Sequence, residues 1–325
     1  MPNINLDDAY ILDETGAQVD KVTGLFTKDE GTTSGEKAFA QLNIGTAGSN
    51  RNLLDNPWFT IDQTSVTTGS TPAATAVDVR DRWRVAYCTS YTFNNDGTIT
   101  TVWNGSGAGA YLIQYALLDE AALWVGKEVT FSGYVDGVLV SKTFTLPTSG
   151  GVLYTLTDGV YLRCNNTTAN NRGLEFQVYH TSTSGKTLGP FKLEKGNIST
   201  LPNDGPPDYD AELAKCQRVF WRLNGTGNYS AYGLAVAPTT TSANLFVTTP
   251  VQMRATPTVT FSGAFQLRVY DSAGDTRGIT AISVDTIASN VIKLSITATS
   301  LTVGWVMQLR NAGTTGYIDF SCRPS

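Results

Sequence analysis

The chain has 325 residues, which is enough for two or three domains of roughly 100–200 residues each. Charged residues make up 16% of the sequence, below the ~25% usual in soluble domains, and Ser, Thr, Asn and Gly fill many polar positions instead. The net charge is −5, and no run of Lys or Arg occurs. Because nucleic-acid binding needs clustered cations that release counterions, the composition argues against a nucleic-acid-binding protein.

Cysteine usage argues against both a metal site and a disulfide framework. The sequence has four cysteines, no CxxC pair and one histidine, and Cys88, Cys164, Cys216 and Cys322 lie far apart. We therefore predict buried free thiols in a protein made in a reducing cytoplasm. The acidic N-terminus lacks the basic and apolar parts of a signal peptide, and no apolar run approaches the ~20 residues that span a bilayer. We expect no membrane insertion.

Residues 1–50 are too polar and too short for a core of their own. A short helix is predicted from Glu36 to Leu42, with Gly45 after it as a stop signal, and its apolar face includes Phe39. Helix nucleation is costly, so a helix this short is stable only on a partner or on copies of itself. We interpret the segment as an N-terminal attachment or oligomerisation arm, with Phe39 and Leu42 as candidate interface residues.

Residues 51–196 have the pattern of a β-rich module. Strict alternation places Trp83, Val85 and Tyr87 on one side of a strand, as in a half-buried strand. Asp136-Gly137 joins two apolar runs with the composition of a type I′ turn, and Asp158-Gly159 joins two more. Many short strands with frequent turns predict a β-sandwich or jelly roll.

Residues 197–218 are predicted to be a proline-rich linker and a short helix, about Asp208 to Phe220. The linker carries three prolines and an Asn-Asp-Gly turn, which makes it a stiff spacer that holds the helix clear of the first module. One apolar stripe follows the helical period. Its members are Tyr209, Leu213, Cys216 and Phe220. We predict that the first three pack between subunits or onto the terminal module.

Residues 219–325 return to short strands separated by Gly, Asn and Asp turns. About 105 residues are sufficient for one small β-sandwich. The fold class predicted for the whole chain is therefore mainly β, with an arm, a jelly-roll sandwich, a linker helix and a C-terminal β tip domain.

Several motifs resemble those of phage tail fibre and receptor-binding proteins. In the first module they are NLLDNPWFTI, DRWRV, LWVGKEVTFSGYV and FKLEKGNISTLP; further on they are AELAKCQRVFWR, TPVQMRATPTVT and YIDFSC. The resemblance implies a homotrimeric protein of the virion tail, with a jelly roll like a carbohydrate-binding module. It also implies that the arm contacts tail or baseplate proteins, that the tip faces the host, and that assembly takes place in the host cytoplasm.

Few residues are candidates for catalysis. His180 is the single histidine, and we interpret it as hydrogen-bonded or solvent-facing. Glycoside hydrolysis needs two carboxylates about 5–9.5 Å apart, and Glu175 and Glu194 are the candidates that a hydrolase would use. We predict a non-enzymatic protein with no catalytic residue, no metal ligand and no cofactor, although Asp-rich turns are compatible with a structural calcium ion.

Sugar binding combines aromatic rings with planar polar groups. The terminal module offers such combinations in WRLNGTGNYSAYG and in the turn after Tyr270, while the core or a trimer interface is the alternative place for these aromatic rings. The candidate glycan-binding residues are Trp221, Asn228, Tyr229, Tyr232, Tyr270, Asp271, Asp275 and Arg277. In the first module, Tyr91, Trp103 and Tyr111 are weaker candidates around the glycine-rich NGSGAGA loop.

The sequence thus predicts a virion tail fibre or receptor-binding protein that attaches to host surface glycan through its C-terminal tip. Two alternatives remain open at this point. One is a structural baseplate or decoration protein, whose aromatic clusters would be buried against other virion proteins. The other is a polysaccharide-degrading tailspike, which would release reducing sugar.

Overall fold

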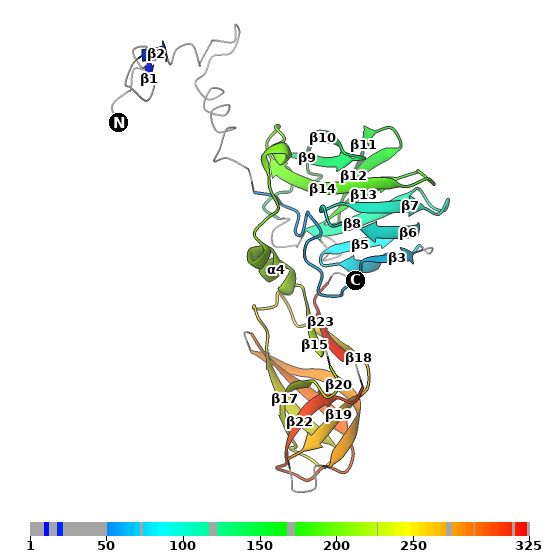
Figure 1. Ribbon diagram of the computed structural model, residues 1–325, viewed down its shortest axis with the longest axis vertical. Helices are drawn as coiled ribbons and strands as arrows, with labels where there is room; N and C mark the ends of the chain where they lie inside the picture. The colour runs from blue at the N-terminus through cyan, green and yellow to red at the C-terminus, as the bar shows by residue number, and fades with distance from the viewer. Residues whose placement is uncertain are drawn as a thin grey trace. The chain divides into compact units, whose positions relative to one another are not determined.

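The structure is a computed structural model that describes residues 10–12, 18–21, 51–71, 74–116, 122–167, 173–225, 227–270, 275–288, 290–313 and 316–323. Residues 1–50 form one unit and residues 51–325 another. In the first unit, β1 (Tyr10–Leu12) and β2 (Gln18–Lys21) pair antiparallel. The helix predicted at 36–42, with Phe39 and Leu42, lies outside the described residues. The rest of the described chain is mainly β with one short α-helix, as predicted (Figure 1).

The first module is a β-sandwich of two six-stranded sheets. Sheet one has the order β10-β9-β14-β7-β6-β3, and sheet two has the order β11-β12-β13-β8-β5-β4. The strands are β3 (Thr68–Thr71), β4 (Val77–Arg80), β5 (Trp83–Ala86), β6 (Cys88–Phe93), β7 (Ile99–Trp103), β8 (Ala110–Ala116), β9 (Glu128–Val135), β10 (Val138–Thr145), β11 (Gly151–Thr157), β12 (Val160–Asn166), β13 (Leu174–His180) and β14 (Lys186–Lys195).

The sandwich core follows from the alternation of each strand. In β9, Val129, Phe131 and Val135 are buried on the predicted inward face. In β5, Trp83 and Val85 are buried, and the Trp83 ring lies 5.1 Å from that of Phe59. The side chains that fill the space between the sheets form one continuous cluster. Burial of this apolar surface is the main force that holds the two sheets together.

The two Asp-Gly hairpins are present but differ in turn type. Asp136 and Gly137 both have positive φ, 49° and 80°, as a type I′ turn requires between β9 and β10. Of the second pair, only Gly159 has positive φ, 67°, and the register of β11 and β12 shifts at the turn. The second hairpin therefore resembles a turn closed by a glycine bulge rather than a type I′ turn.

The proline-rich linker is fastened to the sandwich, which corrects the expectation of a free spacer. Lys192 of β14 is fully buried, and its Nζ donates to Thr200 Oγ1 at 2.7 Å and to Asp204 Oδ2 at 2.6 Å. Glu194, also fully buried, accepts from the backbone N and the hydroxyl of Thr200 at 2.7 and 2.6 Å. A short 3₁₀ helix, Leu201–Asn203, follows. Buried charges persist where they are paired in this way, so the linker has one defined path.

The helix α4 (Tyr209–Gln217) is shorter than predicted and packs on the sandwich. Asp208 caps it by accepting from the Ala211 backbone N at 2.8 Å. Glu212 is buried and accepts from the Asn56 backbone N at 3.1 Å. Cys216 is fully buried within the chain, so it is not available for a contact between subunits.

The three other members of the predicted stripe differ in burial, and the packing of Tyr209 and Leu213 between subunits stays a prediction. Tyr209 is 54% exposed, and Leu213 is half-buried. Phe220 lies beyond the helix, in β15.

The terminal module is all-β, and its strands form a closed barrel and a small sheet rather than two facing sheets. The barrel order is β16-β17-β21-β20-β19-β22, and the three-stranded sheet has the order β15-β23-β18. Their bounds are β15 (Phe220–Gly225), β16 (Ala231–Val236), β17 (Ser242–Thr248), β18 (Thr258–Ser262), β19 (Phe265–Val269), β20 (Thr276–Ala288), β21 (Val291–Ala298), β22 (Val306–Asn311) and β23 (Gly316–Ser321). Inward-pointing apolar side chains fill the barrel as one cluster.

Direct hydrogen bonds join the small sheet to the sandwich. Gln63 Nε2 donates to the Phe220 carbonyl at 2.8 Å, and Arg222 Nη1 donates to the Thr64 carbonyl at 3.3 Å. Arg222 is itself held by a two-pronged ion pair with Asp319, at 2.7 Å on each prong. Within the described chain, no helix has the length and apolar character needed to cross a bilayer.

Candidate functional site

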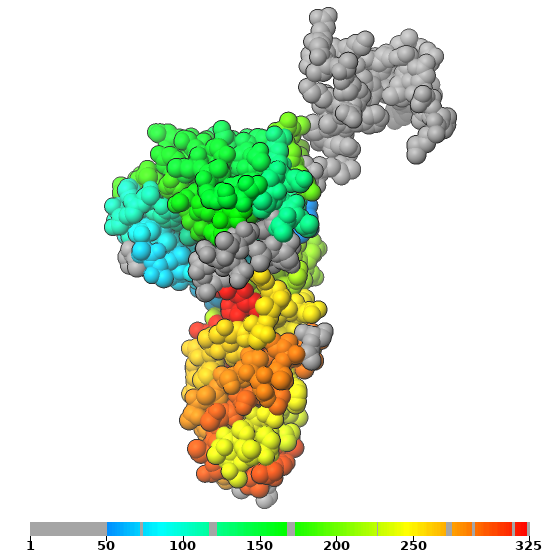
Figure 2. Space-filling model, turned by 180° about the vertical axis from the view of Figure 1, so that it is seen from behind, coloured from blue at the N-terminus to red at the C-terminus, as the bar shows by residue number. Residues whose placement is uncertain are grey.

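Sheet two presents an unusual outward face. In β12, Val160, Leu162 and Cys164 point into the core and are fully buried, so Tyr161 and Arg163 point outward. In β13 and β8 the same alternation turns Tyr179 and Tyr111 outward. Figure 2 shows the sandwich from behind, in colours that run from blue to green along the chain.

The strand register brings these tyrosines together in a line, which we call the tyrosine row. Tyr161 pairs across with Tyr179, and Tyr179 with Tyr111. The ring centroids of Tyr161 and Tyr179 lie 5.1 Å apart with planes at 24°, and those of Tyr179 and Tyr111 lie 4.8 Å apart. Tyr87 continues the row, 5.9 Å from Tyr111. Aromatic pairs at these separations stabilise one another and fix the positions of the rings.

The residues of the row are only partly accessible: Tyr87, Tyr111 and Tyr161 are half-buried, and Tyr179 is 7% exposed. In the described part of the chain, the hydroxyls of Tyr87, Tyr111, Tyr161 and Tyr179 have no hydrogen-bond partner, and none of them is enclosed. Burial of the rings raises the pKa of Tyr111 and Tyr179 above the usual value of a phenol. These two groups are therefore neutral at physiological pH, and each can both donate and accept a hydrogen bond.

Three planar polar side chains and one apolar side chain border the row. The next positions along four neighbouring strands are Arg163, Gln177, the apolar Ile113 and Arg84. Gln177 Nε2 donates to Glu175 Oε1 at 2.8 Å, while Gln177 Oε1 is enclosed and has no partner among the described residues. An orphaned acceptor beside solvent-facing hydroxyls marks a surface built to receive donors.

Glu175 is held among neutral groups. It accepts from Tyr115 OH at 3.1 Å, from Gln177 Nε2 and from Asn165 Nδ2 at 3.1 Å. Arg163 Nε donates to Asn165 Oδ1 at 3.1 Å, which links the exposed arginine to the same network. The face thus combines aromatic edges, amides, a carboxylate and a guanidinium. Such a set can hydrogen-bond to an extended ligand that is rich in hydroxyl groups.

Two of the sequence-predicted glycan residues belong to the tip core. Tyr232 is 9% exposed, and its hydroxyl donates to the Gly316 carbonyl at 2.7 Å. Trp221 is half-buried and stacks on Phe320 at 5.0 Å with planes at 21°. Both rings pack against the apolar cluster of the tip. Tyr232 is buried and its hydroxyl is occupied, which corrects its assignment as a glycan-binding residue, while the assignment of Trp221 stays a prediction.

The other tip candidates are exposed but dispersed. Asn228 and Tyr229 are exposed, and the Arg310 guanidinium lies 4.5 Å from the Tyr229 ring centroid. Tyr270 is 58% exposed.

Two of the charged candidates that follow Tyr270 form an ion pair with each other. Asp275 pairs with Arg277 at 3.2 Å, and Arg277 also donates to the Ser300 carbonyl at 3.1 Å. Asp271 lies outside the described residues. Within the described tip, the structure brings no pair of the predicted aromatic residues into ring contact.

In the first module, one of the three weaker candidates belongs to the row. Tyr91 is 6% exposed, and Trp103 Nε1 donates to the Ser106 carbonyl at 2.7 Å. Only Tyr111 takes part in the row. The sequence analysis missed Tyr161 and Tyr179, although the alternation in VYLRCNN and LEFQVYH carries the signal.

The residues considered for catalysis have structural roles. His180 is fully buried; its Nδ1 accepts from the Ser182 backbone N at 3.1 Å, and its Nε2 lies 2.8 Å from Thr101 Oγ1. Burial lowers the pKa of His180 to about 4. Glu194 is sealed within the linker network, and Glu175 within its polar cluster on the sheet. Their surroundings do not single out a general acid and a nucleophile.

The four cysteines are free thiols, and three of them are buried, as predicted. Burial raises the pKa of Cys88 to about 11, which keeps this thiol protonated. Within the described residues, no three His, Cys, Asp or Glu side chains gather in a way that could hold a metal ion. The structural calcium ion stays a prediction.

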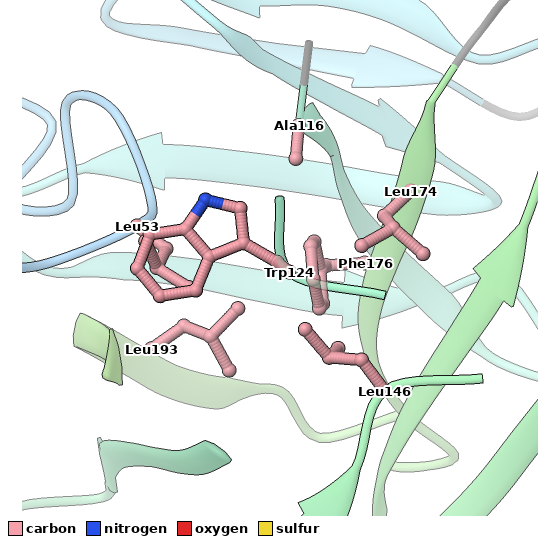
Figure 3. Close-up of a pocket in the computed structure, with 7 residues that line it drawn as sticks. All are labelled: Leu53, Ala116, Trp124, Leu146, Leu174, Phe176 and Leu193. Atoms are coloured by element: carbon pink, nitrogen blue, oxygen red, sulfur yellow. The ribbon is translucent and has the colours of Figure 1, made fainter. Parts of the chain in front are cut away.

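A shallow apolar hollow lies at the surface of the sandwich (Figure 3). Figure 3 shows the Trp124 indole among six aliphatic and aromatic side chains, and Lys195 Nζ lies 4.4 Å from the Trp124 ring centroid. The lining has no polar group besides the indole N–H. It therefore offers little for recognition of a polar ligand, and we interpret it as the outer margin of the core.

The barrel carries a second exposed surface, the apolar barrel patch. It consists of Leu234, Val236, Phe246 and Val306, which are 59%, 47%, 66% and 48% exposed. Val236 pairs across with Val306 and lies beside β17. A group of large apolar side chains on neighbouring strands is a feature of protein–protein contact surfaces.

Comparisons with known proteins give little more. No protein-family model matches the chain, and no curated protein is similar to it. Among solved structures, it is similar to the N-terminal CBM22-1–CBM22-2 tandem domain of Paenibacillus barcinonensis Xyn10C, with 10% identity and a TM-score of 0.21. The match covers 86% of this chain and 100% of that one. A TM-score this low carries no argument, so the chemistry of the tyrosine row has to be judged on its geometry alone.

Proposed function

We propose that the protein is a non-enzymatic adhesin of a virus particle, a tail fibre or receptor-binding protein, that binds glycan on the host surface. The observation that carries the glycan part is the tyrosine row, with four outward tyrosines and a border of planar polar groups. The virion part rests on the sequence resemblance. In this proposal the arm contacts tail or baseplate proteins, and the chain forms a homotrimer that assembles in the host cytoplasm.

The sandwich face is the first candidate for the glycan site. Its rings are fixed by mutual contact, so little side-chain entropy is lost when a ligand binds. Its hydroxyls, which have no partner among the described residues, are available for hydrogen bonds. The tip, which chain order and its aromatic residues favoured in the sequence, is the second candidate, through Tyr229 and Tyr270.

Paired substitutions test the two sites. Tyr161→Phe removes one solvent-facing hydroxyl that has no internal partner, so the fold is expected to be unaffected. Loss of one hydrogen bond at about 0.5–1.5 kcal/mol would weaken glycan binding roughly twofold to tenfold. Tyr161→Ala removes the whole ring and is expected to weaken binding by at least about tenfold.

A control substitution on the other sheet and two substitutions at the tip show which surface binds the glycan. Tyr134→Phe alters a half-buried tyrosine on the outward face of the other sheet and should leave binding unchanged. Binding is measured on a glycan array and by adsorption of fluorescent protein to host cells. If Tyr229→Ala or Tyr270→Ala abolishes binding while Tyr161→Ala does not, the glycan site is at the tip. The assignment of the tyrosine row as the glycan site is then wrong.

A structural baseplate or decoration protein is the second candidate function, favoured by the apolar barrel patch. In that case the patch covers a neighbouring subunit or another virion protein. Light scattering of the purified protein should then give a mass closer to that of the monomer for Phe246→Ser. Val303→Ser, at a similarly exposed loop position, should leave the mass unchanged. A wild-type monomer would contradict the homotrimer.

A further inference from the structure

Beside the tyrosine row, on the same sheet, lies a small hollow lined with arginines. It is shallow and opens to the solvent. Its lining residues are Asp78, Arg82, Arg84, Tyr115 and Arg323. Three guanidinium groups therefore face one carboxylate in a single hollow. We call it the arginine hollow.

The arginines of the hollow have more donors than partners. Arg84 Nη2 donates to the Ala76 carbonyl at 2.9 Å, but Arg84 Nε is enclosed and makes no hydrogen bond in the described part of the chain. Arg323 Nε and Nη2 are also enclosed and have no hydrogen-bond partner in the described part of the chain. Enclosed guanidinium N–H groups without acceptors are costly, so an additional acceptor would be strongly favoured.

The carboxylate of the hollow, Asp78, does not provide good hydrogen bonds for the N–H groups of Arg84 and Arg323. Asp78 lies 3.5 Å from Arg84 Nε and 3.4 Å from Arg323 Nη1, distances longer than the 2.7–2.9 Å of a good charged hydrogen bond. One carboxylate is thus shared loosely between two arginines.

The remaining nearby acids are occupied elsewhere. Asp55 accepts from Arg82 Nε at 2.9 Å, and the fully buried Asp81 accepts from the backbone and the side chain of Gln63, both at 2.7 Å. Among the described acids, it is therefore the loosely placed Asp78 that an incoming anion would compete with for the guanidinium groups of Arg84 and Arg323.

The position of the hollow connects it to the proposed glycan site. Arg84 pairs across with Ile113, which is followed on the next strands by Gln177 and Arg163. Tyr115 lines the hollow and also donates to Glu175 at the border of the row. Three strand spacings separate Arg84 from Arg163, roughly 14 Å. One oligosaccharide can span this distance.

We propose that the arginine hollow binds a carboxylate group of an acidic glycan whose neighbouring sugars lie along the tyrosine row. A planar carboxylate fits the fork of a guanidinium group, and here it would bridge Arg84 and Arg323. The inference rests on the proposed glycan-binding function and names its ligand class: polysaccharides that contain uronic acids or other carboxylated sugars, rather than neutral ones.

The test compares acidic glycans with their neutral counterparts. Full-length protein is titrated calorimetrically with oligosaccharides of polygalacturonate, alginate and hyaluronan, and with the same oligosaccharides after reduction of their carboxyl groups to alcohols. At least one acidic ligand is expected to bind tenfold or more tightly than its reduced form. Arg84→Gln and Arg323→Gln should remove that difference, and Arg84→Lys should restore it only in part, because lysine keeps the charge but not the fork.

Controls separate a specific site from general charge attraction. Arg268→Gln removes the same charge from an exposed position in β19 and should leave the preference intact. Dextran sulfate serves as a strongly anionic ligand without carboxylates. If it binds as tightly as the acidic oligosaccharides, or if Arg268→Gln weakens binding as much as Arg84→Gln, the carboxylate site is refuted. Thermal unfolding of each variant shows that the fold is retained.

The outcomes also distinguish this inference from the proposed function. If neutral and acidic forms bind equally and Tyr161→Ala weakens both, the glycan function stands and the carboxylate site is wrong. If no acidic or neutral ligand binds and host cells are not recognised, the glycan function itself is wrong.

Discussion

Stability in mild acid should depend on the single histidine. His180 is buried without a carboxylate in hydrogen-bond contact, and burial lowers its pKa from 6.5 to about 4. The neutral ring is fixed by two hydrogen bonds: Nδ1 accepts from Ser182 N, so Nε2 carries the proton and donates to Thr101 Oγ1. The folded sandwich therefore excludes a proton that the unfolded chain binds.

The sign and the size of the effect follow from this pKa difference. Above pH 6.5 both states are neutral at His180, and the group does not destabilise the fold. As the pH falls from 6.5 to 4, the unfolded chain takes up the proton first, so the free energy of unfolding decreases. The loss is about 2 kcal/mol at pH 5 and about 3 kcal/mol below pH 4.

Urea unfolding at pH 7 and pH 5 measures this loss, with His180→Gln as the reference. Glutamine does not titrate, so the contribution of every other acid and base cancels in the comparison. We expect wild type to lose about 2 kcal/mol more than His180→Gln between the two pH values. The one imidazole signal in a proton NMR titration gives an independent value. Parallel stability curves together with an NMR pKa near 6.5 would refute the reasoning.

Three further predictions concern the fold. Lys192→Met leaves Glu194 and Asp204 without their cation and should lower the free energy of unfolding by about 3–5 kcal/mol in chemical denaturation. Gly137→Ala meets no atom within 4 Å, but it places a side chain at a φ of 80°, so a loss of about 1 kcal/mol is expected; no loss would mean that the turn relaxes. Asp208→Ala removes the cap of α4 and should cost about 1 kcal/mol, whereas Asp210→Ala, which caps nothing, should cost much less.

Local patterns in the sequence predicted the sandwich well. The inward positions of Trp83 and Val85 and the Asp136-Gly137 turn depend only on residues that are neighbours in the chain, and both features are present. Tyr87, predicted on the same side, instead follows the strand with a φ of 56° and contacts Tyr111 of the outward row. The same local reading did not distinguish two facing sheets from a closed barrel in the terminal module. Closure depends on the pairing of β16 with β22, and residues so distant in sequence leave no local signature.

The linker was harder to predict for a related reason. Its prolines correctly indicate a restricted chain, but its path is fixed by Lys192 and Glu194 on β14. Buried charged residues on a strand look like solvent-facing ones in a sequence. Only the tertiary contact with Thr200 shows that they face the linker.

The candidate site shows the same division between local and tertiary information. Each of Tyr111, Tyr161 and Tyr179 could be placed on an outward strand face by counting alternate positions. That they form one row follows from the register of β12, β13 and β8, which the sequence does not display. At the tip, Trp221 and Tyr232 show the converse: aromatic residues close together in sequence became part of a core.

Closure of the barrel has a consequence for how copies of this protein behave at high density. The strands of a closed barrel have no unpaired backbone edge on which another chain can add a strand, whereas each six-stranded sheet of the sandwich ends in two outer strands, β10 and β3 or β11 and β4. Association through the barrel must therefore use side chains, such as those of the apolar barrel patch. Non-specific strand addition, where it occurs in this chain, is expected at the outer strands of the sandwich, and the barrel is the module suited to close crowding without aggregation.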